Sequence, residues 1–239
     1  MTTLIIDGVI ASHAQIFVDN MLGASIFTTL RVDDGQPQLW PLHWQRLCGH
    51  AQYFGYNIPP EHELVNAIEL YAPKPCAKVR IIINQTSWAQ TLDPYQPPSA
   101  SVYDGVSIIF SKLRPHPQLG AYKTTSYLPY SLAHKEALER GAFEALLCND
   151  EGYVVDGSRT SLLLYDGVVM TALLGGLEGC MRQSIMAYAE QHGITTCKQF
   201  LRPHELRGQL LLSNSLIGAV PVGPINYSLV QKMVHHFRP

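Results

Sequence analysis

The sequence is poor in charge, and its charges are not concentrated. Only 15% of its 239 residues are Asp, Glu, Lys or Arg, the formal net charge is −2, and the seventeen Lys and Arg residues are scattered singly. Proteins that bind nucleic acids or anionic membranes usually gather positive charge on one surface. We therefore expect neither partner, and the composition favours a small-molecule ligand.

Patterns for disulfides and metals are also missing. The five cysteines are odd in number, widely spaced and include no CxxC pair, and no secretory signal precedes them. The ten histidines are dispersed, and the one close pair, His235 and His236, has no carboxylate at metal-ligand spacing. We expect no bound metal and a reducing, cytoplasmic location.

No apolar run reaches the roughly 18 residues that a membrane-spanning helix requires. Hydrophobic residues nevertheless make up 46% of the chain, as in a globular protein with a well-buried core. A chain of this length can hold one large or two small domains. Pro115 and Pro117 predict a boundary between a domain at residues 1–114 and a domain at residues 115–239.

Apolar runs broken by turn residues predict sheet at the start of the chain. A hairpin is expected over residues 3–10 around Asp7-Gly8, and a second hairpin joins residues 23–32 to residues 38–40. Helices are then expected over residues 42–55, which Pro41 opens, and 61–71, and strands over residues 77–83 and 106–110. The intervening residues 84–104 carry three prolines and are predicted to form a long, functional loop.

The second half mixes helices with predicted antiparallel strands. Helices are expected over residues 130–140, 180–192, 204–206 and 227–236. Strands are expected over residues 143–148, 153–156, 161–165, 168–171, 195–200 and 209–213. Short turns separate the first four of these strands, which predicts a meander.

Lys123 stands between the proline-rich connector and the helix predicted at 130–140. Its neighbours, residues 122 and 124–128, carry no charge. A lysine forms an imine with a carbonyl only when its amine is partly deprotonated, which requires desolvation or a neighbouring cation. The setting suits a reactive amine, although an ordinary loop lysine would look the same in isolation.

Three further features could complete a pyridoxal phosphate site, which needs a carboxylate for the ring nitrogen and N–H groups for the phosphate. Asp156 ends an apolar strand, although Asp-Gly-Ser is also a common turn. Gly179 precedes a helix, so the following N–H groups could bind a phosphate or could simply begin the helix. Residues 213–215 follow an apolar strand, where a hydroxyl could reach a phosphate or end the strand in a polar turn.

Several motifs, in order, resemble one enzyme family. They are residues 27–32 (FTTLRV), 42–47 (LHWQRL), 123–129 (KTTSYLP), 133–137 (AHKEA), 155–158 (VDGS), 176–182 (GLEGCMR) and 213–222 (SNSLIGAVPV). Together they are similar to the fold type IV pyridoxal-phosphate enzymes, the class IV aminotransferases, which include branched-chain and D-amino acid aminotransferases and 4-amino-4-deoxychorismate lyase. The resemblance spans almost the whole chain.

The resemblance implies an α+β fold in two domains. A small N-terminal α/β domain would precede a larger C-terminal domain, which holds a pseudo-barrel of mostly antiparallel strands and carries the cofactor lysine. It also implies pyridoxal 5'-phosphate as the cofactor, a small-molecule amine as the substrate and a homodimer. The homodimer is further suggested by Trp88, Tyr95 and Tyr103 in the predicted loop, because exposed aromatic residues of this kind are enriched in interfaces.

The resemblance also implies roles for individual residues. Lys123 would be the Schiff-base lysine, Arg46 a phosphate ligand and Tyr127 a neighbour of the cofactor's phenolic oxygen. Asp156 would face the pyridine nitrogen. The phosphate would also receive the N–H groups of Cys180 and Met181 and the hydroxyl of Ser215. Thr28 or Thr29 would relay a proton to the leaving group.

Two departures separate this sequence from the family pattern. Asp156 stands where the family usually has Glu, and Asn84-Gln85 stands where it usually has Arg-Gly. Arg31, Arg80 or Arg159 could instead supply the cation for a substrate carboxylate.

Within the family, the motifs are most similar to 4-amino-4-deoxychorismate lyase, an enzyme of folate biosynthesis that releases pyruvate and forms 4-aminobenzoate. The alternatives are a class IV aminotransferase acting on branched-chain or D-amino acids and a non-catalytic binding protein that keeps the fold.

Overall fold

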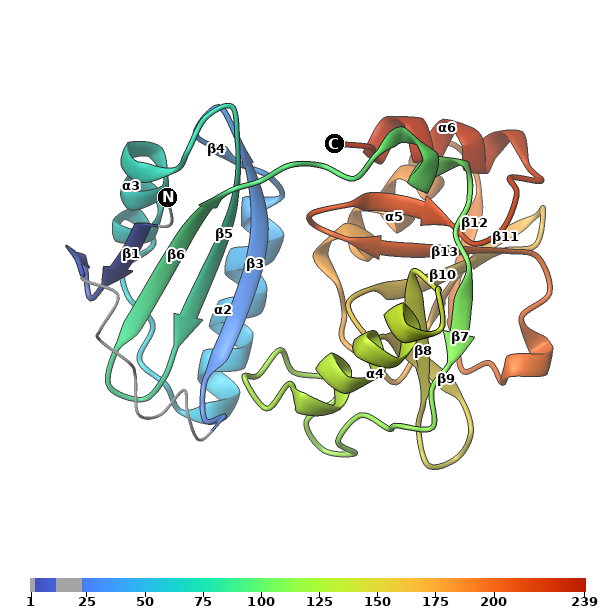
Figure 1. Cartoon of the computed structure of the whole chain (residues 1–239), viewed down its shortest axis with the longest axis horizontal. Coiled ribbons are helices and arrows are strands. Elements are labelled where there is room, and N and C mark those ends of the chain that lie inside the picture. The colour runs from blue at the N-terminus through green and yellow to red at the C-terminus, as the bar shows by residue number, and fades with distance from the viewer. Residues whose placement is uncertain (1–2, 12–22) are drawn as a thin grey trace. The chain divides into compact units, whose positions relative to one another are not determined.

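The computed structural model describes residues 3–11 and 23–239 (Figure 1). These residues fall into two compact units, and each is described by itself. The first unit comprises Met1–Pro97 together with Tyr122–Tyr127, and the second comprises Pro98–Ala121 together with Leu128–Pro239. The segment that carries Lys123 therefore packs with the first unit. Folding domains that meet at residues 114 and 115 stay a prediction.

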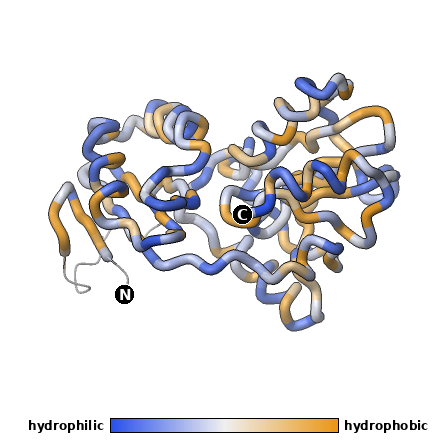
Figure 2. The backbone as a smooth tube through the Cα atoms, turned by 90° about the horizontal axis from the view of Figure 1, so that it is seen from above, coloured by the Kyte–Doolittle hydropathy of each residue, from blue (hydrophilic) through white to orange (hydrophobic). Residues whose placement is uncertain are grey.

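The first unit contains a six-stranded sheet in the order β2-β1-β6-β5-β3-β4. The strands are β1 (Thr3–Ile6), β2 (Val9–Ile10), β3 (Ile26–Asp33), β4 (Gln36–Pro37), β5 (Cys76–Ile83) and β6 (Trp88–Pro94). Every neighbouring pair is antiparallel. The predicted hairpin at residues 3–10 is confirmed, and the hydropathy colours show it as two hydrophobic strands joined by a hydrophilic turn (Figure 2). A second hairpin also forms, but β3 pairs with residues 36–37 rather than with the predicted residues 38–40, because a helix already begins at Trp40.

Two helices, α2 (Trp40–Phe54) and α3 (Glu61–Tyr71), supply the rest of this unit's core, and α2 runs along the sheet in Figure 1. Side chains alternate between the two faces of a strand, and in β3 the residues Ile26, Leu30 and Val32 are fully buried. They pack in one cluster with Leu47 and Ala51 of α2 and with Leu64 and Ile68 of α3. The opposite face of β3 remains half-exposed, and polar residues occupy most of it.

The prediction of a long loop over residues 84–104 is wrong. The carboxamide oxygen of Asn84 accepts the N–H groups of Thr86 and Ser87, which folds a tight turn. The chain then returns as β6, with Pro94 at its last position. Residues 100–104 form a 3₁₀ turn, η1 (Ala100–Asp104). Trp88 and Tyr103 are 8% and 4% exposed, so they are core residues rather than exposed interface aromatics.

The second unit contains two smaller sheets. One is a five-stranded sheet in the order β12-β11-β10-β13-β14, and the other is a three-stranded sheet in the order β7-β8-β9. Their strands are β7 (Ile108–Phe110), β8 (Glu144–Cys148), β9 (Val154–Gly157), β10 (Ser161–Tyr165), β11 (Val169–Leu173), β12 (Thr195–Gln199), β13 (Gln209–Asn214) and β14 (Gly218–Pro221).

The predicted meander is therefore wrong, because β9 and β10 lie in different sheets. The tight loop between them, residues 158–160, is tied back to β8 and redirects the chain. Most neighbouring strands are antiparallel, but β11 and β12 are parallel, as are β7 and β8. Strand β14 had not been predicted.

Helices in the second unit are α4 (Leu128–Glu139), α5 (Cys180–Gln191) and α6 (Ser228–Phe237), with a 3₁₀ turn, η2 (Pro203–Glu205). Each was predicted to within a few residues. Helix α5 connects the parallel pair β11 and β12, as parallel neighbours require a crossover. The α+β class is confirmed.

Candidate active site

Lys123 lies beside the first residues of β3. The N–H of Phe27 donates to the carbonyl oxygen of Lys123 across 2.8 Å, and Ile26 and Thr124 form an antiparallel bridge. The N–H of Lys123 donates to Nδ1 of His50, on α2, across 3.4 Å. The lysine is thus held by backbone contacts to a strand and a helix of the same unit.

Two aromatic rings flank the Lys123 amine. Its Nζ lies 4.5 Å from the ring centroid of Phe27 and 5.2 Å from that of Tyr127. The two rings meet edge to face, with centroids 5.6 Å apart. This contact brings Tyr127 to the predicted lysine. Phe27, part of the motif at residues 27–32, is a flanking residue whose role at the lysine the sequence did not predict.

Arg46, on α2, reaches the same unit's β3. Its Nη2 donates to Oγ1 of Thr28 across 2.7 Å, and that oxygen also lies 2.7 Å from Nδ1 of His43. Thr28 and His43 are both 0% exposed. A buried, hydrogen-bonded set therefore fixes the guanidinium that the resemblance assigns to the phosphate.

Burial lowers the pKa of His43 well below its ordinary value and that of His50 to about 4. The nearby charges of Arg46 and Lys123 lower both further, because a third positive charge would be repelled. The two histidines are therefore neutral at pH 7. Sequence reasoning missed both, although positions 43, 46 and 50 recur at the spacing of one helix face.

Thr29 lies on the opposite face of β3 from Thr28. Its Oγ1 lies 3.4 Å from Nε of Arg80, its partner on β5, and the Arg80 guanidinium lies 5.4 Å from the Phe27 ring centroid. Arg80 and Lys123 therefore contact the same aromatic ring. The two threonines that were predicted as interchangeable differ sharply in surroundings.

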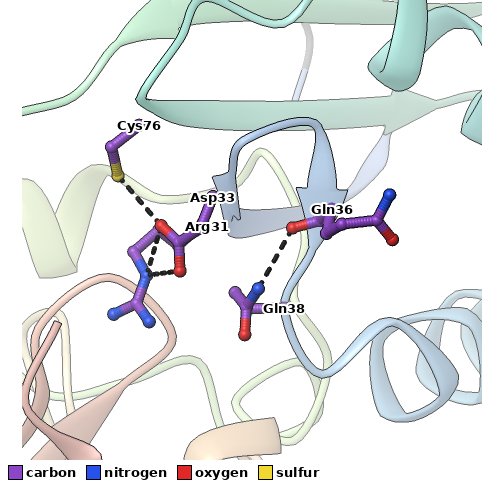
Figure 3. A network of polar contacts seen from close by, with 5 residues as sticks. All are labelled: Arg31, Asp33, Gln36, Gln38 and Cys76. Atoms are coloured by element: carbon purple, nitrogen blue, oxygen red, sulfur yellow. Dashed lines mark hydrogen bonds and ion pairs between the residues drawn. The ribbon is translucent and has the colours of Figure 1, made fainter.

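Arg31, two residues further along the same face of β3, is already paired. Its Nε donates to both carboxylate oxygens of Asp33, at 3.0 and 2.9 Å, and the Cys76 thiol donates to Asp33 across 3.2 Å (Figure 3). Burial and the Asp33 carboxylate together raise the pKa of Cys76 to about 11. The pairing leaves Arg31 less suited to a substrate carboxylate than Arg80.

Asp156, in the second unit, is 6% exposed and lies on β9. Its Oδ2 accepts the N–H of Leu177 across 3.2 Å. Burial lowers the pKa of Arg182, on α5, and the carboxylates of Asp156 and Glu178 oppose that shift. Asp156 thus stands in the electrostatic field of a buried cation.

The loop after Asp156 is organised by Glu144, a fully buried residue of β8 that sequence reasoning missed. Its carboxylate accepts the N–H groups of Ser158 and Arg159 at 3.1 and 3.2 Å and the hydroxyl of Thr160 at 2.9 Å. The Ser158 hydroxyl also bonds to it. A buried charge surrounded by donors is well compensated. Arg159 itself places its guanidinium over the Phe143 ring, 5.8 Å from the centroid.

The beginning of α5 is closely packed around glycines. A Cβ on Gly179, the residue before the helix, would lie 2.6 Å from Oγ of Ser161, and a Cβ on Gly176 would lie 2.2 Å from the Val155 carbonyl oxygen. The first-turn N–H groups, including those of Cys180 and Met181, point out of the helix end, where its dipole is positive. This cradle of backbone donors fits a phosphate.

Ser215 follows β13 by one residue and is 9% exposed. Its neighbour Ser213 donates to the Ser161 carbonyl oxygen across 3.1 Å, and the Ser161 hydroxyl donates to the Leu177 carbonyl oxygen across 3.2 Å. These bonds connect the end of β13 to the segment before α5. Ser215 thus lies in the same part of the second unit as the α5 cradle.

The predicted residues therefore gather in two sets. The first unit brings together Lys123, Tyr127, Arg46 and Thr28, with Thr29 on the other face of β3. The second unit holds Asp156, Cys180, Met181 and Ser215. Among residues 3–11 and 23–239, no cluster of three or more potential metal ligands occurs, and no helix is long and apolar enough to cross a membrane. Each set holds groups of the kind that pyridoxal phosphate requires: an amine beside aromatic rings and an arginine in the first unit, and a buried carboxylate and a helix N-terminus in the second.

Comparison with known proteins agrees with this description. Fold and site define a pyridoxal-phosphate-dependent enzyme of fold type IV. Residues 25–225 match the model of the family described as amino-transferase class IV, and the chain belongs to this family. The sequence-based expectations of family, enzyme class and cofactor are confirmed.

Individual relatives differ in their described activities. A crystal structure provisionally described as a 4-amino-4-deoxychorismate lyase superposes with a TM-score of 0.89 and is 37% identical, covering 95% of this chain and 96% of that one. A branched-chain-amino-acid aminotransferase from Pseudomonas aeruginosa is 30% identical over 122 residues, which is 48% of this chain and 38% of the relative. A protein of Methanocaldococcus jannaschii, provisionally named as the same activity, is 24% identical and covers 86% and 80% of the two chains.

Proposed function

We propose that this protein is a 4-amino-4-deoxychorismate lyase, which eliminates pyruvate from its substrate to give 4-aminobenzoate. The observation that carries the proposal is the 37% identity, over nearly the whole of both chains, to a structure with that description. The described aminotransferases match either a smaller part of the chain or at lower identity. Production of 4-aminobenzoate would place the enzyme in folate biosynthesis, in the cytoplasm, and we expect it to be a homodimer.

The reaction breaks two bonds of the substrate. The C–H bond at the amino-bearing carbon is cleaved first, then the C–O bond to the enolpyruvyl group, and the ring becomes aromatic as the enol gains a proton and leaves as pyruvate. Bound pyridoxal phosphate supplies an electron sink for the negative charge left by proton removal. Lys123 would hold the cofactor covalently, and its amine, when free, would accept the proton.

The remaining residues hold charges in place. The phosphate would be bound by Arg46, by the first-turn N–H groups of α5 at Cys180 and Met181, and by the Ser215 hydroxyl. Asp156, a buried carboxylate, would face the pyridine nitrogen and favour its protonated form. Tyr127, beside Lys123, would contact the phenolic oxygen.

The structure supports a choice between the two threonines and among the three arginines. Thr28 is fully buried and bonded to Arg46, whereas Thr29 is half-buried and faces Arg80. Thr29 is therefore the better group to give a proton to the leaving enol. Arg80, whose guanidinium lies over the ring that also contacts Lys123, is the better cation for a substrate carboxylate, because Arg31 is paired with Asp33.

The second candidate is a class IV aminotransferase. The match to the archaeal protein over 230 residues favours it, as does the partial match to the Pseudomonas aminotransferase. A transaminase would use the same lysine, carboxylate and phosphate ligands. The two activities would differ in which carbon atom is reprotonated and in which substrate carboxylates the protein binds.

Two parallel assays test the proposal. One supplies aminodeoxychorismate and follows 4-aminobenzoate and pyruvate, and the other supplies a branched-chain or D-amino acid with 2-oxoglutarate and follows glutamate. We expect equal amounts of 4-aminobenzoate and pyruvate and little glutamate, and the Lys123→Ala variant should form neither product. Fast glutamate formation without 4-aminobenzoate would replace the lyase with the aminotransferase.

A further inference from the structure

We propose that His43 is a positioning residue that orients the phosphate-binding guanidinium of Arg46 through the hydroxyl of Thr28. This inference rests on the proposed function, because it takes Arg46 as a phosphate ligand. The three side chains form one continuous set, with 2.7 Å between Nη2 of Arg46 and Oγ1 of Thr28 and 2.7 Å between that oxygen and Nδ1 of His43.

The hydrogen atoms in this set can be assigned from the chemistry of its members. A guanidinium only donates, so Oγ1 of Thr28 accepts from Arg46. The single hydroxyl hydrogen of Thr28 then donates to His43, which requires Nδ1 to be unprotonated and places the ring hydrogen on Nε2. A protonated His43 would lose this bond and would add a positive charge beside Arg46 and Lys123.

His43 is a polar residue at a fully buried position, which indicates a specific role for its imidazole ring. The ring is 0% exposed, and its Nε2 has no hydrogen-bond partner among the described residues. A buried polar atom without a partner destabilises the fold, and an apolar ring of similar size would avoid this penalty. The bond that His43 does make, at Nδ1, is the one that fixes Thr28, and Thr28 in turn fixes Arg46.

The position of Thr28 also explains why its side chain connects His43 to Arg46. It lies on the face of β3 that α2 covers, so its hydroxyl meets two side chains from successive turns of one helix. A helix side chain such as Arg46 has several rotatable bonds, and holding one rotamer in advance reduces the entropy lost when a ligand binds. His43 would therefore act on phosphate affinity without touching the phosphate.

The test compares dissociation constants for pyridoxal phosphate and pyridoxal, measured by absorbance on the full chain after removal of the cofactor. The dissociation constant for pyridoxal divided by that for pyridoxal phosphate gives a ratio that isolates the phosphate contribution. His43→Phe, which fills the site without an acceptor, and Thr28→Val, which has nearly the same shape without a hydroxyl, should each lower the ratio about tenfold. The double variant should lower it no further than either single variant, because all act through one set of bonds.

Two substitutions at position 43 provide the matched control. Asparagine can present an acceptor near the position of Nδ1 and should retain much of the ratio, whereas glutamine places its amide nearer the position of Nε2 and should behave like phenylalanine. Melting temperatures of all variants separate a loss of stability from a loss of phosphate contribution. If His43→Phe does not fold, the ratio for His43→Gln decides the inference.

The Arg46→Gln variant tests the phosphate role of Arg46 separately from the positioning role of His43. If it leaves the ratio unchanged, Arg46 does not hold the phosphate and that part of the proposed function fails. If it lowers the ratio while His43→Phe and Thr28→Val do not, the phosphate role of Arg46 stands and the role of His43 is overturned. If the double variant of His43→Phe and Thr28→Val lowers the ratio by the sum of the two single effects on free energy, the role of His43 is also overturned.

Discussion

The backbone N–H of Phe27 donates to the carbonyl oxygen of Lys123, so the predicted cofactor lysine is held against the beginning of β3. The same residue places its ring 4.5 Å from the lysine amine. One strand therefore both anchors the backbone of Lys123 and flanks its reactive atom. This contact ties the lysine to the helix that carries Arg46 and His43, because that helix packs on the other face of the same strand.

The carboxylate of Asp156 should be needed for turnover but not for attachment of the cofactor. Replacing it with Asn removes the negative charge but keeps the shape and the bond from Leu177, so the covalent cofactor should still form while turnover falls at least a hundredfold. Asp156→Glu, which restores the residue usual in the family, should keep activity within about tenfold of the native enzyme. The measurement is kcat with the preferred substrate, and unchanged turnover in the Asn variant removes Asp156 from the site.

Gly176 provides a test of the packing around Asp156. A Cβ at this position would lie 2.2 Å from the carbonyl oxygen of Val155 and 3.0 Å from Cβ of Asp156, so Gly176→Ala must displace β9. We expect a loss of about 1–3 kcal/mol in the free energy of unfolding and weaker cofactor binding.

Gly49 on α2 is the matched control, because a Cβ there would meet nothing within 4 Å. Gly49→Ala should stabilise the protein by up to about 1 kcal/mol, since alanine favours a helix more than glycine does. Equal urea midpoints for the native protein and Gly176→Ala would show that β9 tolerates the displacement.

The stability of the folded protein should depend on pH because α2 carries two histidines, the fully buried His43 and the half-buried His50. The folded pKa of His50 is about 4 against an ordinary value of 6.5, and that of His43 is lowered as well. Between these values the unfolded chain binds more protons than the folded one, so the free energy of unfolding should fall as the pH falls from 6.5 towards 4.

His50→Asn keeps an acceptor but removes the titration, so it should flatten this dependence in urea unfolding of the cofactor-free protein. His62→Asn, at an exposed position of α3, controls for the loss of a histidine. An identical pH dependence in the native protein and the His50 variant would contradict the electrostatic account of α2.

The quaternary structure stays a prediction. The resemblance to the family predicts a homodimer. Two of the three aromatic residues in the predicted loop do not support it, because Trp88 lies in the core and the Tyr103 hydroxyl donates to the carbonyl oxygen of Ile217. Light scattering at micromolar concentration should give twice the mass of the chain. A fully active monomer would refute the dimer.

Much of the local structure could be predicted from the sequence because it is encoded locally. The predicted helix at residues 61–71 matches α3, where Leu64 and Ile68 recur at helical spacing and are fully buried. The Asp7-Gly8 and 33–35 turns were likewise recognisable from their residues. The predictions failed where pairing between distant strands determines the structure. Strand β6 was missed because prolines lie at and after its end, and the separation of β9 and β10 into different sheets was not visible in the local sequence.

The candidate site shows the same division. Lys123, Arg46 and Asp156 could be proposed because each stands in a motif of ordered neighbours. His43, His50 and Glu144 could not, because their importance lies in contacts with distant parts of the chain, such as the bonds from Glu144 to residues 158–160. The different surroundings of Thr28 and Thr29 follow from strand alternation, but only the packing of α2 shows which face is covered.

The most direct test of the central claim is to identify the lysine that holds the cofactor. The protein as purified is treated with borohydride, which reduces the bond between the lysine and pyridoxal phosphate to a stable one, and the labelled peptide is located by mass spectrometry. We predict a single label on Lys123, a yellow protein before reduction, and loss of both label and colour in Lys123→Ala but not in Lys135→Ala, an exposed lysine of α4. A label on another lysine, or no label on a protein saturated with cofactor, would contradict the account.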